Sequence, residues 1–524
     1  MSACLIEVSE LSVTAQGAAR PELDRFSLSL GAGESVVVLG EAGSGKEALL
    51  RVLGGFPEKT EAIAGSIRFG DREARSIAKR PRPAIRTAYL PSPQSKPFVP
   101  HASVLSQLSR VVARKLAEPP ASAREEIRLA LERLKGAPPL SALNHVPSKL
   151  DSVTMAWGLL AACLAQTPEL VLADHPFADI GPIAVCALLD ALAAEQKRLG
   201  FALLYATGTL QPVARFAGRV LVIREGRVVE EGNAARLASG HSHAYTRMLF
   251  KAMPKLDAER PKTRNVRGQP LLQVHDLDLA PGPRRREGLT FELRRGASLA
   301  LVGEEGSGRR ELAHAVLGLE RPPQGRVVFD AVDLGVLSPG MTLRMRRRIA
   351  FITGADDALD PRMTLWDTVD EPLRAHLGLS SDLVAGYREA ALKRVGLASY
   401  DGRRSVASLG AFDRRRLQVA RAIVGAPLLA VVDEPLRGMD AFAQTILREV
   451  LSDFRTYQGP AFLVITADFT VAQALADDAL VFHEGKVVER GAIVDILKAP
   501  KHPHTKELIK AVSLPNLSLD AAAG

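Results

Sequence analysis

Two glycine-rich segments of the chain have the residue types and spacing of a phosphate-binding loop. Gly40-Glu-Ala-Gly-Ser-Gly-Lys46 fits the pattern G-x-x-x-x-G-K, and Gly303-Glu-Glu-Gly-Ser-Gly-Arg309 repeats it with arginine in the last position. Glycines let backbone N–H groups wrap around a phosphate, and the start of a following helix adds positive dipole. The candidate nucleotide-binding residues are Gly40, Gly43, Ser44, Gly45, Lys46 and Glu47 in the first segment, and Gly303, Gly306, Ser307, Gly308, Arg309 and Arg310 in the second.

Both loops depart from the full motif at the next position, where a Ser or Thr hydroxyl normally ligates Mg²⁺. This residue is Glu47 in the first segment and Arg310 in the second. Arg309 and Arg310 would oppose the dipole of the helix that they begin. Either local glutamates balance the two arginines, or a bound phosphate does so, with Arg310 supplying charge where Mg²⁺ would otherwise sit. The local glutamates are Glu304, Glu305 and Glu311.

The loops belong to a longer internal repeat. The segment from Arg224 to Gly232, with Glu-Gly at its second and third positions, returns 259 residues later between His483 and Gly491. His243-Ala-Tyr-Thr-Arg247 returns at the same spacing as His502-Pro-His-Thr-Lys506. This period is far longer than that of a solenoid, so each copy is a domain. We expect domains at residues 1–255 and 271–524, joined by a linker at 256–270.

Each copy has the pattern of an α/β domain. A short apolar strand leads into the glycine-rich loop and then into a helix with apolar periodicity, and two buried strands follow. The predicted strands are 35–39, a strand ending at Asp174, and 202–206, matched by 299–302, a strand ending at Asp433, and 462–466. The predicted helical segments are 48–53 and 104–134, matched by 312–319 and 390–423. The fold class is therefore α/β, with two P-loop NTPase domains in tandem, each a mostly parallel sheet with a helical insert.

Composition is that of a folded protein with more than one domain. The chain has 524 residues, of which 47% are hydrophobic and 24% charged. Lys and Arg number 68 against 59 Asp and Glu, which suits an anionic partner such as nucleotide, RNA or a membrane face. Three cysteines without paired or metal-ligand spacing indicate a reducing compartment. No apolar run approaches the roughly 18 residues of a membrane helix, so a membrane role requires a separate permease.

Both copies resemble ATP-binding cassette (ABC) ATPases, and specifically those of oligopeptide and dipeptide importers, over nearly the whole chain. The loops indicate only a P-loop NTPase, whereas the importer type rests on the H-P-Y-T-like tails at His243–Pro254 and His502–Pro515. The resemblance implies ATP and Mg²⁺ as cofactors, and permease subunits and a solute-binding protein as partners. It places the chain in the cytoplasm, on the inner face of the cell membrane. It also implies that the two copies pair within one chain, each phosphate loop facing the other copy's signature loop.

In this family the acidic strand end carries an Asp that ligates Mg²⁺, followed by a Glu that activates water. The resemblance makes Asp174 and Asp433 the metal positions, and His175 and Glu434 the catalytic positions. A neutral imidazole can accept a proton, but it lacks the charge and geometry of a carboxylate. Loss of a positioned base typically costs about 10²–10⁴ in rate. An Asp at a strand end before proline can also serve only as a helix-entry residue.

Other family positions are altered as well. The signature loop, which caps the γ-phosphate of the partner copy, aligns with Leu150–Thr154 and Leu409–Asp413. Asp151 puts a carboxylate at its serine position, and Val153 and Phe412 replace a glycine. We therefore predict hydrolysis that is weak or lost, and a regulatory or structural subunit. The remaining differences are Gly208 and Ala467 at the switch histidine, and Pro91 and Gly354 at the glutamine that links nucleotide to permease.

Two other function classes stay open at this point. Soluble tandem ABC proteins that act on ribosomes or nucleic acid share the fold, but they typically carry a long charged helical linker. Here the linker is short, punctuated by prolines and preceded by an importer-like tail. Arginine clusters at 284–286, 346–348 and 414–416 lack interleaved aromatics, so nucleic acid is not the expected partner. The third class is an active ATPase with unusual residues, which the pair Asp433-Glu434 keeps open.

Overall fold

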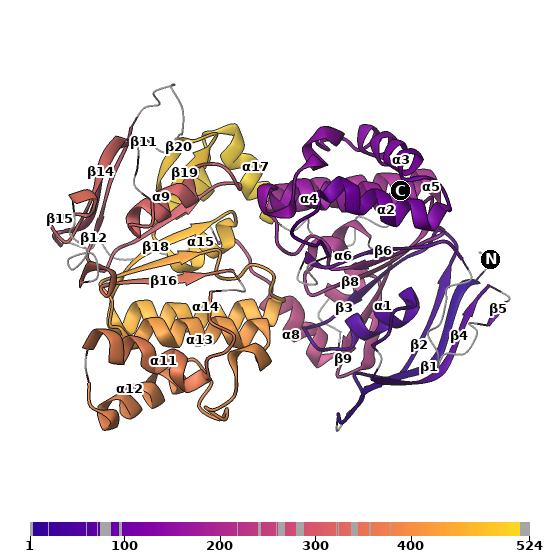
Figure 1. The fold of residues 1–524 in the computed structure, drawn as a ribbon, viewed down its shortest axis with the longest axis horizontal. Coiled ribbons are helices and arrows are strands. Elements are labelled where there is room, and N and C mark those ends of the chain that lie inside the picture. The colour runs from indigo at the N-terminus through magenta and orange to yellow at the C-terminus, as the bar shows by residue number, and fades with distance from the viewer. Residues whose placement is uncertain are drawn as a thin grey trace. The chain divides into compact units, whose positions relative to one another are not determined.

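The structure is a computed structural model (Figure 1). The chain divides into two compact units, the first built on Met1–Met253 and the second on Pro254–Met439 and Ala443–Ser513. The arginine cluster at 284–286 lies outside the described residues. The structure describes residues 4–18, 20–58, 60–70, 72–73, 85–93, 97–216, 218–238, 243–257, 259, 268–278, 288–320, 322, 324–336, 344–355, 358–377 and 379–513.

The first unit is organised around a six-stranded sheet in the order β10-β9-β3-β8-β7-β6. The pair β10–β9 is antiparallel and the other pairs are parallel. Its strands are β3 (Ser35–Leu39), β6 (Thr87–Leu90), β7 (Leu170–Asp174), β8 (Ala202–Thr207), β9 (Arg219–Arg224) and β10 (Arg227–Gly232). A second, antiparallel sheet has the order β2-β1-β4-β5, with β1 (Cys4–Ala15), β2 (Leu23–Gly31), β4 (Glu61–Phe69) and β5 (Arg72–Glu73).

Helices connect the parallel strands. Local chemistry sets several helix ends: Ser103 caps α2 by accepting a hydrogen bond from Ser106 N, and Gly200 ends α5 with a left-handed φ of 72°. The helices are α1 (Lys46–Gly54), α2 (Val104–Leu116), α3 (Pro120–Arg133), α4 (Ser152–Ala165), α5 (Pro182–Leu199), α6 (Gln211–Arg215), α7 (Ala234–Ala238) and α8 (Ala244–Ala252). The helices α2, α3 and α4 form the insert between β6 and β7.

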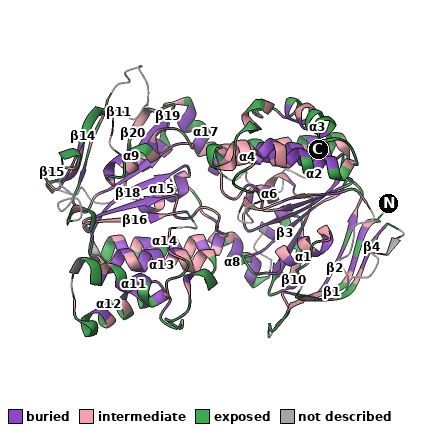
Figure 2. Ribbon diagram, in the orientation of Figure 1, coloured by how far each residue is buried: buried purple, intermediate pink, exposed green. Residues whose placement is uncertain are grey.

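The strand before the first phosphate loop is buried on both of its faces. In β3, Val36 and Val38 pack in a core that includes residues of the antiparallel sheet and α1. Val37 and Leu39 pack in a second core that includes residues of α2 and α4. Figure 2 shows this strand as buried. A strand buried on both faces is expected to be continuously apolar, and such a strand holds the following loop rigidly.

The second unit repeats this plan. Its six-stranded sheet has the order β16-β17-β18-β13-β19-β20, and its antiparallel sheet has the order β12-β11-β14-β15. The strands are β11 (Pro270–Asp278), β12 (Leu289–Arg294), β13 (Ser298–Val302), β14 (Gln324–Phe329), β15 (Val332–Asp333), β16 (Ile349–Thr353), β17 (Leu429–Asp433), β18 (Ala461–Thr466), β19 (Asp478–His483) and β20 (Lys486–Ala492). The helices are α9 (Arg309–Val316), α11 (Leu365–Pro372), α12 (Ser381–Arg394), α13 (Ala411–Val424), α14 (Ala441–Gln458), α15 (Phe469–Leu475), α16 (Ile493–Lys498) and α17 (Pro503–Val512).

The predicted fold class is confirmed, and the predicted strands match β3, β7, β8, β13, β17 and β18 to within one residue. Helix limits were less accurate. The predicted helix at 312–319 begins three residues earlier and ends at Val316, and the predicted segment 104–134 is two helices separated before Pro120. The sequence did not predict the antiparallel sheets. Within the described ranges, no helix has the length and apolar character needed to cross a membrane.

Candidate nucleotide-binding sites

The first phosphate loop connects β3 to α1 through backbone conformations that favour glycine. Gly43 and Gly45 have φ values of 76° and 101°, in the left-handed region. A Cβ on Gly45 would lie 2.3 Å from the carbonyl oxygen of Glu22, and one on Gly40 would lie 2.6 Å from that of Ile223. The loop is therefore packed against neighbouring backbone with no space for side chains at these two positions.

A hairpin turn holds each phosphate loop from outside. Gly226, in the turn between β9 and β10, donates its N–H to Ser44 O at 2.9 Å, and Gly485 donates to Ser307 O at 3.1 Å in the second unit. The preceding glutamate and the glycine both have positive φ, as a two-residue type I′ turn requires. The Glu-Gly pairs of the internal repeat are thus loop supports. Sequence reasoning found the repeat but did not assign this role.

Lys46 is buried and already has partners at the start of α1. Its Nζ donates to Glu41 O at 2.9 Å and pairs with Glu47 Oε1 at 2.7 Å. Ser44 Oγ is buried and has no hydrogen-bond partner. A phosphate in this loop would have to compete with Glu47 for the ammonium group.

Asp174 is the last residue of β7 and His175 follows it, both close to Lys46 and Glu47 of this loop. Asp174 Oδ2 accepts a hydrogen bond from Tyr89 Oη at 2.8 Å, a contact that the sequence did not reveal. Burial raises the pKa of the Asp174 carboxyl, and Glu47 raises it further. His175 Nδ1 lies 3.2 Å from Thr207 Oγ1. Burial, with the positive charge of Lys46, lowers the pKa of His175 to about 4, so the imidazole is neutral at physiological pH.

The first loop offers the donor set that Mg²⁺ prefers. Mg²⁺ usually binds one or two carboxylates together with substrate phosphates and water. Glu47 and Asp174 are two carboxylates close enough for one to raise the pKa of the other. No cluster of three or more metal-ligating side chains occurs in the part of the chain that the structure describes, so the remaining ligands would come from nucleotide and water. These residues fit the ion.

The second loop contains two arginines that pair with the acidic strand end. Arg309 is buried, and its NH2 lies 2.8 Å from Glu434 Oε1. Arg310 Nε lies 3.6 Å from Asp433 Oδ2, and its NH1 lies 3.6 Å from Glu305 Oε1. Burial raises the pKa of Asp433, while Arg310 opposes this effect. A guanidinium group beside the metal-position carboxylate repels a second cation, so this site does not fit Mg²⁺.

The expectation that local glutamates balance the two arginines is correct only in part. Glu305 pairs with Arg310, whereas Asp433 and Glu434, more than 120 positions away in the sequence, supply the other partners. Burial raises the pKa of Glu304 and the charge of Arg309 opposes this effect, so Glu304 also faces a loop arginine. Within the described part of the chain, no ion pair joins Glu311 to either arginine. Spacing along the sequence could not reveal these contacts, because they depend on the pairing of strands.

Glu434 occupies the same backbone geometry as His175. Their φ values are 45° and 40°, and each backbone N–H donates to the neighbouring strand, to Ile465 O and Ala206 O respectively. Glu434 accepts hydrogen bonds from Ala467 N at 3.0 Å and Thr466 Oγ1 at 3.2 Å. With Arg309, three donors hold this carboxylate. Left-handed φ at non-glycine residues is strained, and such strain is common at functional sites.

The signature positions differ between the units. Asp151 caps α4, because its carboxylate accepts hydrogen bonds from Thr154 N at 2.6 Å and Thr154 Oγ1 at 2.9 Å. The Asp151 carboxylate therefore occupies a donor at the N-terminus of α4 that an anion would otherwise bind. In the second unit, Gly410 caps α13 without a side-chain bond, and Asp413 in the first turn accepts from Tyr400 Oη at 2.7 Å.

The tails are tied to the phosphate-loop region. Glu230 of β10 accepts a hydrogen bond from His243 N at 2.9 Å, and His243 caps α8 by accepting from Tyr245 N. Tyr245 Oη donates to Glu41 Oε1 at 3.1 Å, so the tail contacts the phosphate loop. In the second unit, Glu489 accepts from His502 N at 3.1 Å, and His504 stacks on His483 at 4.0 Å between ring centroids.

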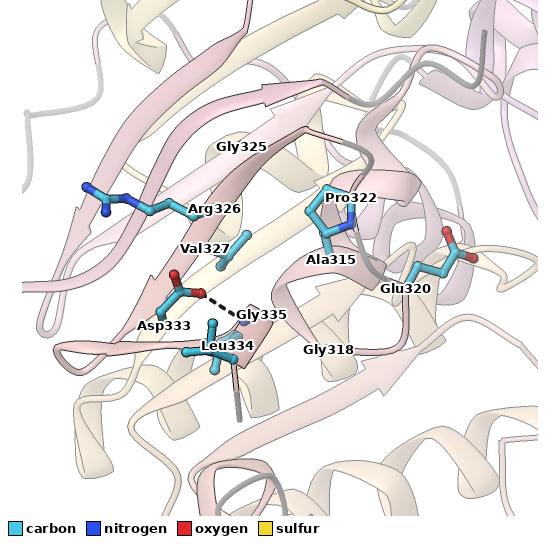
Figure 3. Close-up of a pocket in the computed structure, with 11 residues that line it drawn as sticks. Ala315, Gly318, Glu320, Pro322, Gly325, Arg326, Val327, Asp333, Leu334 and Gly335 are labelled. Carbon is cyan, nitrogen blue, oxygen red and sulfur yellow. Dashed lines mark hydrogen bonds between the residues drawn. The ribbon is translucent and has the colours of Figure 1, made fainter. Parts of the chain in front are cut away.

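A pocket of about 200 Å³ lies at the other end of α9 (Figure 3). Its walls are Ala315 of α9 and Gly318, which follows the helix, together with Val327 of β14 and Leu334. The figure also shows Asp333 accepting the N–H of Gly335, at 2.8 Å. The phosphate loop precedes the first turn of α9, so this pocket does not belong to the nucleotide site.

The neutral state of His175 predicts an acid-dependent loss of stability. The ordinary pKa of about 6.5 in the unfolded chain exceeds the folded value of about 4, so the unfolded state binds more protons between these values. The contribution of His175 to the free energy of unfolding is therefore fully present above pH 6.5, and about 3 kcal/mol of it is lost as the pH decreases to 4. The measurement is denaturant unfolding followed by Trp157 fluorescence in a Trp366→Phe chain, since these are the two tryptophans.

The His175→Gln variant of the same chain is the control, because it lacks the titrating group. The wild-type chain is expected to lose about 3 kcal/mol more than this variant over the same interval. Equal pH dependence in the two chains would show that His175 titrates normally.

Comparison with known proteins agrees with this geometry. A family model described as "ABC transporter" matches residues 23–178 and 287–437, and one described as "Oligopeptide/dipeptide transporter, C-terminal region" matches residues 229–280. The chain is 29% identical to the ABC transporter ATP-binding protein YejF of Escherichia coli, covering 97% of this chain and 99% of that protein. It is 28% identical to the peptidoglycan transport ATP-binding protein YejF of Agrobacterium fabrum, covering 97% and 96%. Identity to the glutathione import ATP-binding protein GsiA of Escherichia coli is 28%, covering 93% and 86%.

Proposed function

The chain belongs to the ABC transporter family, and from this premise we propose that it is the ATP-binding subunit of an importer for peptide-like solutes, with weak or lost hydrolysis. The observation that carries the importer assignment is the oligopeptide/dipeptide transporter model, which matches residues 229–280, from the end of the first unit into the start of the second. The similarity to a glutathione import protein and a peptidoglycan transport protein, over nearly the whole chain, supports the same class of solute.

In this proposal the chain works beside permease subunits at the inner face of the cell membrane, and a solute-binding protein delivers the solute. The two units pair within one chain, so a single polypeptide supplies both phosphate loops. Because the described helices include none that could cross a membrane, the translocation path would belong to the permease.

The residues of each loop have defined tasks in nucleotide binding. Backbone N–H groups of Gly43–Gly45 and of the matching second loop would surround the phosphates, while Lys46 and Arg309 would supply positive charge. When bound at the first loop, Mg²⁺ would neutralise charge that develops on the transferred phosphoryl group. Glu47 and Asp174 are the residues that would hold it. These contacts are sufficient for binding and do not require a catalytic base.

Hydrolysis is expected to be weak because neither base position accepts a proton efficiently. Burial lowers the pKa of His175 to about 4, so its imidazole is a weak base, and the Glu434 carboxylate is held by Arg309, Thr466 and Ala467. Since phosphoryl transfer depends mainly on positioning and charge, such losses compound. A subunit that binds ATP without rapid turnover would act as a regulatory or structural part of the importer.

The partner of the chain is the direct test of this proposal. Crosslinking in cells, followed by solubilisation of the membranes and identification of the captured proteins, is expected to retrieve a permease of the peptide type. The full chain is compared with a chain that lacks the tail helix α17, because this deletion leaves both phosphate loops in place. Capture of ribosomal proteins or nucleic acid without a permease would contradict the proposal and favour a soluble tandem ABC protein.

A further inference from the structure

We propose that the phosphate loop of the second unit binds the triphosphate chain of a nucleotide without a divalent cation, with Arg310 in place of the cation. This inference rests on the proposed function for one point only, namely that ATP is the ligand. The starting observation is that the second site does not fit Mg²⁺, whereas the first site does.

Two buried side chains at the second loop have a hydrogen-bond donor without an acceptor. Arg309 is only 4% exposed, and although its NH2 pairs with Glu434, its NH1 is buried and has no hydrogen-bond partner. Ser307 is 5% exposed, and its Oγ also lacks a partner. Buried donors without acceptors are unfavourable, so both groups favour a ligand that brings acceptor oxygens. Phosphate oxygens in front of this loop are such acceptors, and Arg309 can keep Glu434 through its other nitrogen.

Arg310 provides a second, more accessible cation. Its side chain is 40% exposed, and its contacts with Asp433 and Glu305 are both 3.6 Å long. These are ion pairs at a distance beyond that of a good N–H···O hydrogen bond. The fork of the guanidinium group therefore keeps its capacity to donate to two phosphate oxygens.

The charges of the matched positions differ between the two loops in a way that favours a metal at the first loop and not at the second. In the first unit, Lys46 pairs with the Glu47 carboxylate at 2.7 Å, and the Asp174 carboxylate lies beside them. The other nearby cation, Arg51, is already paired with Glu22 and Glu61, so a bound phosphate would meet two carboxylates and one cation unless a metal is added.

In the second unit, Arg309 and Arg310 face Asp433 and Glu434, two positive against two negative charges. Glu305 adds a carboxylate, but Arg437 NH2 lies 3.6 Å from it. The carboxylates of Asp433 and Glu434 are therefore each paired with an arginine before any metal binds, and Glu304 is a further carboxylate near Arg309. Asp433 keeps one oxygen without a partner, and Arg310 holds the other, so arginine and a metal would compete for the same carboxylate.

The experiment is calorimetric titration of the full-length chain with ATP, in EDTA and in Mg²⁺. In EDTA we expect about one ATP per chain. Arg310→Thr restores a hydroxyl at the position that follows the loop, and it is expected to weaken binding in EDTA by about 10- to 100-fold. The same variant should bind more tightly when Mg²⁺ is added, because Thr and Asp433 can then serve the cation. Inorganic tripolyphosphate should displace ATP from the wild-type chain in EDTA.

Two controls accompany Arg310→Thr. Arg310→Lys keeps the charge but loses the fork, so it should weaken binding in EDTA less than Arg310→Thr does. Arg362→Ala removes an exposed arginine paired with Asp360 and should change nothing. Binding by the wild-type chain only with Mg²⁺, EDTA binding that is unchanged in Arg310→Thr, or failure of tripolyphosphate to displace ATP would overturn the inference and leave the proposed function intact. A chain that binds no ATP in either condition would overturn both.

Discussion

Replacing Gly45 by alanine is expected to remove Mg²⁺-dependent ATP binding from the first unit. The residue has a φ of 101°, and a Cβ would lie 2.3 Å from Glu22 O, so the backbone of the loop must move. A left-handed conformation alone costs a side-chain-bearing residue about 1–3 kcal/mol, and the collision adds to this. We expect the first unit to lose about 3 kcal/mol or more of its unfolding free energy, and its affinity for ATP to fall at least about 100-fold.

Calorimetry in Mg²⁺ measures the binding. Trp157 fluorescence during denaturation reports the stability of the first unit, and Trp366 fluorescence in a Trp157→Phe chain reports that of the second. Gly386→Ala is the matched control. Gly386 lies in α12, and a Cβ there would have open space, so alanine is expected to stabilise the second unit by about 1 kcal/mol. A lower unfolding free energy in Gly45→Ala together with a higher one in Gly386→Ala would support the geometry of the loop. A Gly45→Ala chain that binds the same number of ATP molecules with unchanged affinity would refute the assignment of this loop to phosphate.

The second large effect expected is a very low rate of ATP hydrolysis. We expect that replacing one altered residue by the family residue does not bring this rate back to a normal value. His175→Glu supplies a carboxylate in the first unit, and an isolated missing base would then account for a gain of about 10²–10⁴ in rate. We expect a gain below about tenfold, because Glu47 still holds Lys46, Gly208 still replaces the switch histidine, and the signature loop of the other copy still carries Phe412. The measurement is release of labelled phosphate at saturating ATP.

Glu434→Gln serves as the comparison for the other base position. Because three donors already hold the Glu434 carboxylate, its removal is expected to lower the residual rate by less than the 10²-fold typical of a free base. A rise of 100-fold or more in His175→Glu, or a collapse of the rate in Glu434→Gln, would show that one of these positions is catalytically intact.

The sequence was informative where the chemistry is local. A continuous apolar strand followed by a glycine-rich loop predicted β3 to the residue, and the strand ends at Asp174 and Asp433 were located correctly. These features depend on residues that are adjacent in the chain. The antiparallel sheets were missed because strands such as β1 and β4 pair over about fifty residues, and their alternating pattern is weak.

Contacts at the candidate sites were harder to predict. The pair Arg309–Glu434 joins a loop to a strand end 125 positions later, and Tyr89 reaches Asp174 from the neighbouring strand β6. The sequence identified Asp151 only as a carboxylate at the serine position of the signature loop, whereas the structure shows that it also caps α4. Such roles depend on the register of strands and on the direction of side chains, which spacing alone does not specify.

The hairpin glycines Gly226 and Gly485 have a consequence for how the two copies diverged after duplication. Each copy retains this turn and its bond to the phosphate loop, although the residues that would perform hydrolysis now differ between them. The shape of the loop therefore depends on a scaffold that the catalytic residues do not share. A copy can lose turnover, change its preferred counter-ion or acquire a signalling role while it keeps the same loop, so that nucleotide binding and hydrolysis are free to evolve as separate traits.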